Sequence, residues 1–344
     1  MKKVVTIYDI AREAGVSPAT VSRILTGAST VRPEKRERVL ELMRQYNYQP
    51  NALARALTAT RSRLIGMIVA DSGNPYYTSV YSACENEAFS RGYSMLLMST
   101  GSRPENETVM LRKTQEMRTD AVILCGGRID LEVPDPLFMQ ELAALTEKTR
   151  LVVGSRSPMA GIPGIAVDHR ASVRTAIQYL AELGHRDIGF IYCGEQYYGT
   201  VERLDQFRKE LRAYGFPCRE EWLIQTDTYS IAAGEEGTRK MLKLERLPTA
   251  LLGMNDLVSA GILQELLRNG LRVPEDISLL GFDDTFVSEI TSPRMSSVSY
   301  DYQLFAKMLV DAALNQEEAN TESRTIPVFM TERASCAPPQ RKNS

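Results

Sequence analysis

From Leu64 onward, short apolar runs alternate with polar stretches of helical pattern, and this alternation constrains the fold more than any other feature of the chain. Each run is shorter than a typical helix and has no polar face, which is typical of strands buried on both faces. Strands that alternate with helices form parallel sheets covered on both sides, so we expect an α/β body in two similar lobes. The runs are LIGMIVA (64–70), SMLLMST (94–100), AVILCG (121–126), RLVVGS (150–155), DIGFIYCG (187–194), TALLGM (249–254) and SLLGF (278–282).

The first 63 residues are basic, whereas the rest of the chain is acidic. Residues 1–63 contain twelve Lys and Arg against five Asp and Glu, a net charge of +7, and the remaining residues carry −9. A basic head on an acidic body indicates a polyanionic partner for the head alone. Charge by itself leaves an alternative open, because a solvated helix surface can have the same composition.

The head carries the signals of two short helices joined by a tight turn. Thr6 and Asp9 have the spacing of a capping box, and Gly15 permits the left-handed turn that ends the first helix. Ser17 then caps a second helix whose first residue is Pro18. Two such helices joined by a glycine-containing turn form a helix-turn-helix unit, whose second helix can enter the major groove of DNA.

The head resembles the DNA-binding headpiece of the LacI/GalR family of bacterial transcriptional regulators. The segments that carry the resemblance are TIYDIAREAGVSPATVSRIL (6–25) and VRPEKRERVLELMRQYNYQPNALARAL (31–57). The match continues in register almost to the C-terminus. It implies an all-α headpiece and a hinge helix, followed by a two-lobe α/β domain of the periplasmic-binding-protein type, with parallel sheets and three crossover strands.

The resemblance also implies the domain boundaries. The expected parts are the headpiece at 1–50, the hinge helix and linker at 51–63, the first lobe at 64–166 and 293–323, and the second lobe at 167–292 and 324–334. The last residues contain proline and charge without an apolar repeat, so we expect 335–344 to be a disordered tail.

Eleven residues of the head are expected to contact DNA. Small hydroxyl side chains on the second helix suit phosphates, and Arg23 suits a bidentate contact to guanine. Leu57 matches the leucine with which the family wedges open a base step in the minor groove. Ordinary helix surface and a plain linker are the alternatives. The expected contacts are Thr6, Ser17, Pro18, Ala19, Thr20, Ser22 and Arg23 in the headpiece and Asn51, Ala54, Arg55 and Leu57 in the hinge.

Aromatic, carboxylate, amide and arginine side chains follow the predicted strands. Because ligands of open α/β sheets bind beyond the carboxyl ends of the strands, these residues are candidates for an effector site. Together they suit a polyhydroxylated ring. As alternatives, Asn255 and Asp283 could cap helices and Tyr76 could belong to the core. The candidates are Tyr76, Tyr77, Arg156, Arg203, Tyr229, Asn255 and Asp283.

Several function classes are not expected. No nucleophile with a base partner and no phosphate-binding glycine loop is present, so we expect no enzyme and no cofactor. Five widely spaced cysteines and two histidines offer no metal site and fit a cytoplasmic protein. No apolar run approaches the ~18 residues of a membrane span. We expect His185 to make structural hydrogen bonds only.

These inferences predict a homodimeric repressor that binds palindromic double-stranded operator DNA. A small molecule bound between the lobes, expected to be a sugar, controls the affinity for the operator. A purine or a phosphoprotein corepressor is the alternative effector. A sugar-binding protein without a DNA role is a second alternative, which the basic helical head argues against.

Overall fold

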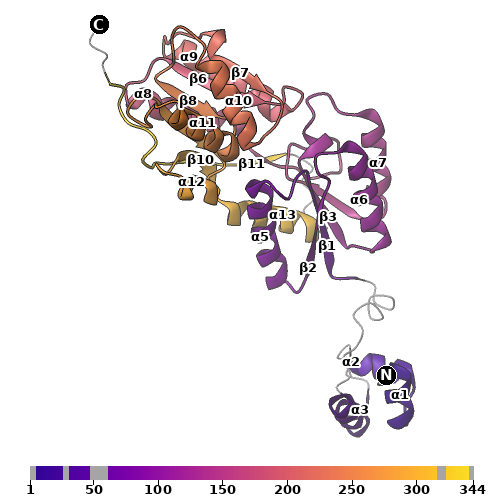
Figure 1. The fold of residues 1–344 in the computed structure, drawn as a ribbon. Coiled ribbons are helices and arrows are strands. Elements are labelled where there is room, and N and C mark those ends of the chain that lie inside the picture. Colours follow the sequence, from indigo (N-terminus) through magenta and orange to yellow (C-terminus); the bar gives the residue numbers. More distant parts are fainter. Residues whose placement is uncertain (1–4, 26–30, 47–60, 316–322, 341–344) are drawn as a thin grey trace. The chain divides into compact units, whose positions relative to one another are not determined.

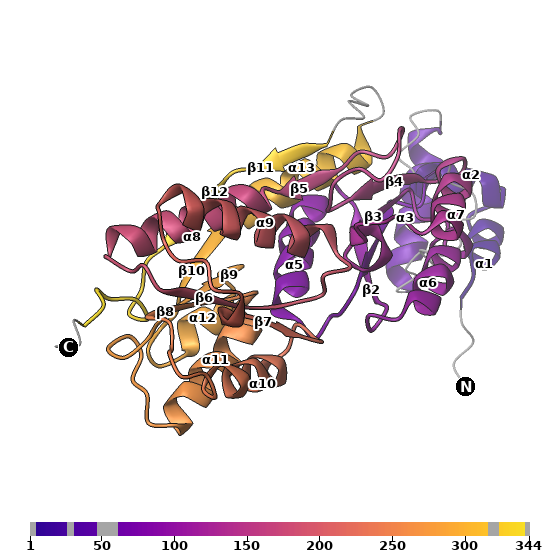
Figure 2. The same ribbon diagram turned by 90° about the horizontal axis from the view of Figure 1, so that it is seen from above.

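The computed structural model describes residues 5–25, 31–46, 61–315 and 323–340, and the chain forms two units, Met1–Ser62 and Arg63–Ser344. The first unit contains helices α1 (Ile7–Glu13), α2 (Pro18–Leu25) and α3 (Pro33–Gln45). The second unit is the two-lobe α/β body shown in two views in Figures 1 and 2. No helix in the described part of the chain is long and apolar enough to cross a membrane.

The caps predicted for the first unit are confirmed. Thr6 Oγ1 accepts the Asp9 N–H at 3.3 Å, and the Asp9 carboxylate accepts the Thr6 N–H at 3.0 Å. Gly15 has a φ of +64°, and Ser17 Oγ accepts the Thr20 N–H at 3.2 Å. These caps fix the ends of α1 and α2 so that both helices can share one small core. That core consists of Ile10, Ala11, Val21, Ile24, Val39 and Leu42.

The first lobe is built on a four-stranded parallel sheet in the order β2-β1-β3-β4. Its strands are β1 (Leu64–Val69), β2 (Ser94–Ser99), β3 (Ala121–Cys125) and β4 (Arg150–Val153). Alternate residues of β1 enter different cores: Ile65 and Met67 pack with α5 and α13, and Ile68 packs with α6 and α7. The covering helices are α5 (Pro75–Ser90), α6 (Pro104–Glu116), α7 (Pro136–Thr146) and α13 (Tyr302–Leu314), with the short 3₁₀ helix η1 (Gly127–Asp130) after β3.

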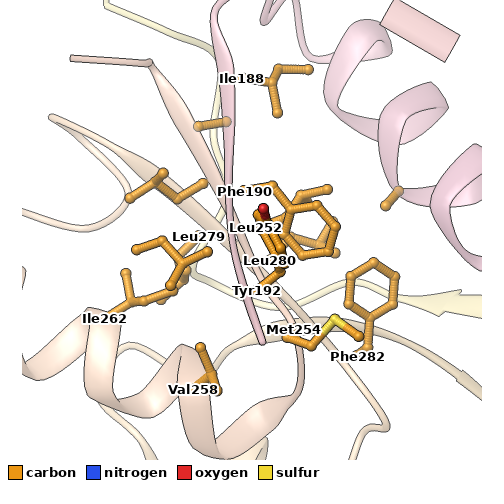
Figure 3. Packing of buried hydrophobic residues seen from close by; sticks show 14 of the residues in the cluster. Ile188, Phe190, Tyr192, Leu252, Met254, Val258, Ile262, Leu279, Leu280 and Phe282 are labelled. Atoms are coloured by element: carbon orange, nitrogen blue, oxygen red, sulfur yellow. The ribbon is translucent and has the colours of Figure 1, made fainter. Parts of the chain in front are cut away.

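The second lobe is built on a six-stranded sheet in the order β12-β10-β9-β8-β6-β7, in which only β12 is antiparallel to its neighbour. Its core, shown in Figure 3, includes the Phe190 and Phe282 rings at a centroid distance of 6.3 Å. The strands are β6 (Ile188–Cys193), β7 (Leu223–Thr226), β8 (Ala250–Gly253), β9 (Ser278–Phe282), β10 (Ser296–Tyr300) and β12 (Val328–Thr331). The helices are α8 (His169–Glu182), α9 (Tyr198–Ala213), α10 (Ile231–Met241), α11 (Asp256–Arg268), α12 (Phe286–Ile290) and the 3₁₀ helix η2 (Glu220–Trp222).

The chain crosses between the lobes near β5 (Ile165–Val167) and β11 (Arg324–Ile326), which pair in parallel as a separate two-stranded sheet. It also crosses between β10 and α13. The expectation that 293–323 belongs to the first lobe is wrong for β10. Ser296 of β10 pairs with Leu280 of β9, so the strand belongs to the second sheet, and α13 after it packs on the first.

The expectation of a disordered tail was wrong for residues 335–340. Ser335 is fully buried, and its Oγ accepts the Ser296 N–H at 2.8 Å and donates to the Leu279 carbonyl at 2.5 Å. The Ala337 carbonyl lies 2.9 Å from His185 Nε2. The tail is held by hydroxyl and backbone groups, which leave no apolar signal in the sequence. Residues 341–344 lie outside the described residues.

Candidate functional site

A cavity of about 510 Å³ lies between the two lobes of the second unit, at the carboxyl ends of the strands. Both lobes contribute to its wall. The structure brings six of the seven candidate effector residues together there: Tyr76, Tyr77, Arg203, Tyr229, Asn255 and Asp283. Arg156, the seventh, is not part of the wall.

Asp283 follows β9 and has a left-handed backbone, with a φ of +95°. Such a conformation costs a non-glycine residue of order 1–3 kcal/mol and is common at functional sites. Its carbonyl oxygen accepts hydrogen bonds from Ser299 Oγ at 2.7 Å and from the Tyr302 hydroxyl at 2.8 Å. These bonds hold the turn and leave the carboxyl group at the cavity. Burial raises the pKa of the Asp283 carboxyl, and Arg203 opposes the shift.

Arg203, on α9, brings a buried guanidinium group to the wall, with 8% of the residue exposed. Its Nη1 donates to the Met254 carbonyl at 2.8 Å, and the group lies 4.7 Å from the centroid of the Phe282 ring. The ring and the carbonyl fix the orientation of the guanidinium. Its Nε has no hydrogen-bond partner among the described residues, so this N–H is available to a ligand.

Asn255 and the tyrosines complete the predicted set. Asn255 Oδ1 accepts the Val258 N–H at 2.9 Å, so Asn255 caps α11, which was the alternative to a role in ligand binding. The residue also lines the cavity. Tyr76 and Tyr77 meet edge to face at 5.0 Å between ring centroids. Burial raises the pKa of both tyrosines well above the usual value, so their hydroxyls stay protonated.

Asp130 and His169, which were not among the predicted residues, also line the cavity. The Asp130 carboxylate accepts a hydrogen bond from Ser155 Oγ at 2.5 Å, and burial raises its pKa to about 6. His169 is the first residue of α8, and burial and Arg203 hold its pKa well below the usual value. His169 comes two residues after β5, so the rule that found the other candidates would also find His169 once β5 is known to be a strand. Asp130 stands five residues after β3 and reaches the wall through a turn, which that rule does not predict.

Arg156 instead joins the two lobes next to the cavity. Its guanidinium pairs with Glu132 at 3.0 Å and lies 4.4 Å from the centroid of the Tyr198 ring. The Tyr198 hydroxyl accepts the Arg156 N–H at 3.4 Å, and the Glu132 N–H donates to the Gln196 carbonyl at 2.8 Å. Because Tyr198 and Gln196 come from the second lobe, we call these four residues the inter-lobe contact.

The first unit presents α2 as its candidate DNA-reading surface. Val21 and Ile24 are buried, while Ala19 and Arg23 lie on the exposed side. The remaining candidates have the following positions: Ser17 and Thr6 are exposed, and Pro18, Thr20 and Ser22 are half-buried. The candidates Asn51, Ala54, Arg55 and Leu57 lie outside the described residues.

Three hydroxyl groups among the candidate DNA contacts already have partners within the unit. Ser17 Oγ lies 2.9 Å from Thr20 Oγ1, and Thr6 Oγ1 donates to the Asp9 carboxylate at 2.7 Å. The guanidinium of Arg23 reaches back along its own helix, where its Nε donates to the Ala19 carbonyl at 3.4 Å. The contacts of Ser17 and Arg23 hold their side chains near the start of α2, the end that helix-turn-helix proteins present to base edges, whereas the Thr6 contact closes the cap of α1.

Comparison with known proteins identifies the class. Residues 6–51 match the bacterial regulatory proteins of the lacI family, and residues 177–336 match a periplasmic binding protein-like domain. The chain is 30% identical over 337 residues to catabolite control protein A of Priestia megaterium, which covers 94% of this chain and 96% of that protein. The chain belongs to the LacI family of bacterial regulatory proteins.

Other LacI-family members are similar over most of their length. The HTH-type transcriptional repressor PurR of Actinobacillus pleuropneumoniae is 31% identical over 302 residues, which is 85% of each chain. A lac repressor dimer bound to operator and to the anti-inducer ONPF has a TM-score of 0.82 at 27% identity, covering 97% of this chain and all of that one. A complex of the transcriptional regulator CelR with cellobiose has a TM-score of 0.70 at 26% identity, covering 96% and 99%.

LacI-family membership explains why a basic helix-turn-helix unit and a ligand cavity occur in one chain. Members of the family are transcription regulators rather than enzymes; they bind operator DNA, form dimers and respond to small molecules. The chain is therefore a DNA-binding transcriptional regulator of the repressor type, controlled by a ligand. The two-lobe fold expected from the sequence is confirmed.

Proposed function

We propose that this chain is a homodimeric repressor whose effector is a sugar, bound in the cavity between the lobes. The observation that carries the proposal is the wall of the cavity, where tyrosine rings stand beside carboxylate, amide and guanidinium groups. Asp, Asn and Arg side chains pair with neighbouring hydroxyl groups, and an aromatic ring covers the C–H face of a sugar. The similarity to a CelR–cellobiose complex supports the same conclusion.

The proposed ligand residues are Tyr76, Tyr77, Arg203, Tyr229, Asn255 and Asp283. Arg156 takes a different role in the proposal, because it bonds Glu132 and packs on Tyr198 at the inter-lobe contact. Tyr198 belongs both to this contact and to the cavity wall. A ligand that touches Tyr198 therefore acts on the contact between the lobes, which lets its binding energy favour one lobe arrangement over another.

On DNA, two headpieces of a homodimer read the two halves of a palindromic operator. The proposed phosphate and base contacts are Thr6, Ser17, Pro18, Ala19, Thr20, Ser22 and Arg23, and the proposed hinge contacts are Asn51, Ala54, Arg55 and Leu57. The positive charge of the head supplies the salt-dependent part of the affinity. Such a protein works in the cytoplasm, where the DNA is.

The test combines operator binding with ligand response. A palindromic operator is selected from random DNA with the purified protein, and fluorescence anisotropy measures binding with and without each member of a sugar panel. Asp283→Ala should bind the operator normally and lose the sugar response, because it removes a carboxyl group from the cavity wall. The matched control is Asp205→Ala, since Asp205 is exposed on α9 of the same lobe. A sugar response that persists in Asp283→Ala, or a response to a purine or a phosphoprotein instead, contradicts the proposal.

A further inference from the structure

The cavity wall carries more negative than positive groups. Asp130 and Asp283 lie inside, and Asp71 and Asp227 lie at the exposed rim. Arg203 is the one Lys or Arg among the described lining residues. The other basic side chain, His169, is uncharged at neutral pH, because burial and Arg203 lower its pKa. The wall therefore disfavours a ligand that brings a further negative charge, such as a phosphate group, into this poorly solvated cavity.

The single guanidinium is already engaged. Arg203 Nη1 is bonded to the Met254 carbonyl, its plane lies against Phe282, and its charge is offset by the neighbouring Asp283 carboxyl group. A phosphate group on a ligand needs a cation that is free to face it with two parallel N–H groups. Arg203 keeps its Nε–H for a ligand, but no second Lys or Arg stands beside it among the described lining residues to balance the two charges of a phosphate group.

The helix N-termini that reach the cavity do not replace the missing cation. The start of α5 is capped by Asn74, that of α10 by Ser230 and that of α11 by Asn255, each of which accepts a backbone N–H of the first turn. The start of α9 also lies on the wall and has no side-chain cap, but the Asp130 carboxyl group lies close to its first residues, Tyr197 and Tyr198. Helix N-termini bind anions through such N–H groups, and here part of that capacity is taken by the chain itself.

The hydrogen-bonding atoms of the wall that have no partner suit the hydroxyl groups of a ligand. Within the described part of the chain, four buried side-chain polar atoms have no hydrogen-bond partner, and two of them, His169 Nδ1 and Arg203 Nε, belong to residues of the cavity wall. A guanidinium N–H only donates, whereas a neutral imidazole nitrogen donates or accepts according to its tautomer. A hydroxyl group can satisfy both, since it donates and accepts.

We infer that the effector is an uncharged, hydroxyl-rich molecule, that the cavity rejects the phosphorylated form of the same molecule, and that His169 is one of the residues that bind it. This inference rests on the proposed sugar site and narrows it from sugars in general to neutral ones. His169 lies where it can contribute directly, on the wall and beside the Tyr198 ring at 5.5 Å between centroids.

The test is isothermal titration of the full-length protein with matched pairs: glucose and glucose 6-phosphate, trehalose and trehalose 6-phosphate, sorbitol and sorbitol 6-phosphate, with cellobiose, maltose and hypoxanthine as further probes. A neutral member should bind, and its phosphate should bind at least about tenfold more weakly because of the unmatched charge. In Asp130→Asn the penalty on the phosphate should shrink, since one negative group is gone. A phosphate that binds as tightly as its neutral partner overturns the inference while leaving the sugar site in place.

Two variants test His169. His169→Ala should weaken binding of the neutral sugar about tenfold, the usual cost of one lost hydrogen bond with its partner left buried, and His169→Gln should recover part of it. Arg170→Ala is the matched control, because Arg170 is exposed at the next position of α8, pairs with Glu202 and does not line the cavity. Unchanged sugar affinity in His169→Ala removes His169 from the site. Binding of hypoxanthine alone, or of no probe, overturns the proposed sugar function itself.

Discussion

Replacing Asp130 by Asn should make the folded protein more stable at neutral pH. Burial raises the pKa of this carboxyl from 3.8 to about 6, so ionisation is harder in the folded state than in the unfolded chain. Each pKa unit corresponds to about 1.4 kcal/mol, which gives a cost on the order of 3 kcal/mol for the ionised form. Water in the cavity screens part of this cost, and an amide accepts the Ser155 hydrogen bond less strongly than a carboxylate does. We therefore expect a net gain of about 1–2 kcal/mol in the free energy of unfolding.

The sign of the pH dependence follows from the raised pKa. Between the unfolded and the folded pKa values the folded protein binds more protons, so its stability falls as pH rises through about 4 to 6. The Asp130→Asn variant does not lose stability in this way, because an amide does not ionise. Its advantage over the unmodified protein should therefore be absent below about pH 4, grow across that window and stay constant above it.

Urea unfolding followed by circular dichroism at a series of pH values measures this difference. The matched control is Asp205→Asn, because Asp205 is exposed on α9 and lies outside the cavity wall. The reasoning is refuted if Asp130→Asn destabilises the protein at neutral pH, or if its gain is the same at both ends of the pH range.

The remaining predictions concern the tail and the hinge. Ser335→Ala should cost about 1–3 kcal/mol of stability, because it leaves the buried Ser296 N–H without its acceptor. Truncation after Ala334 should cost more, since it also removes the Ala337 carbonyl from His185; an unchanged melting temperature would show that the tail does not stabilise the second lobe. Leu57→Ala should lower operator affinity at least about tenfold while leaving sugar affinity unchanged, because only the DNA wedge is lost; equal operator affinity would rule the wedge out.

The parts of the fold that could be predicted from the sequence are those buried on both faces. All seven apolar runs became strands, namely β1, β2, β3, β4, β6, β8 and β9. In all of these except the edge strand β2, nearly every residue is buried, which leaves a continuous apolar signature. The run SSVSY of β10 has no such signature, although all its residues are buried. Its serine Ser297 donates to the buried Asp256 carboxylate at 3.2 Å, and Ser296 bonds the tail. A strand whose inward groups are hydroxyls cannot be recognised from hydropathy, because its stability depends on partners far along the chain.

The failure to predict Asp130 as a cavity residue has a related cause. Asp130 stands five positions after Cys125, the last residue of β3, and reaches the wall only through a turn. Gly126 and Gly127 make that turn with φ values of +81° and +79°. A side chain at Gly127 would strike the Glu107 carboxylate, so the turn is specific to glycine there. Counting residues past a strand does not predict such a return, since it depends on the path of the loop.

Arg156 shows the limit of inference from position alone. An arginine just beyond a strand end lies near the ligand in the expected fold, and the same position also faces the opposite lobe. Whether the arginine contacts the ligand or the opposite lobe depends on which partner is nearer. Here the Arg156 guanidinium pairs with Glu132 and packs on the Tyr198 ring. Tyr198 also lines the cavity, and its hydroxyl lies 3.3 Å from Ser155 Oγ, which in turn donates to Asp130. The charge state of the cavity and the contact between the lobes are therefore joined through one chain of hydrogen bonds, so Arg156 can affect the ligand response without touching the ligand.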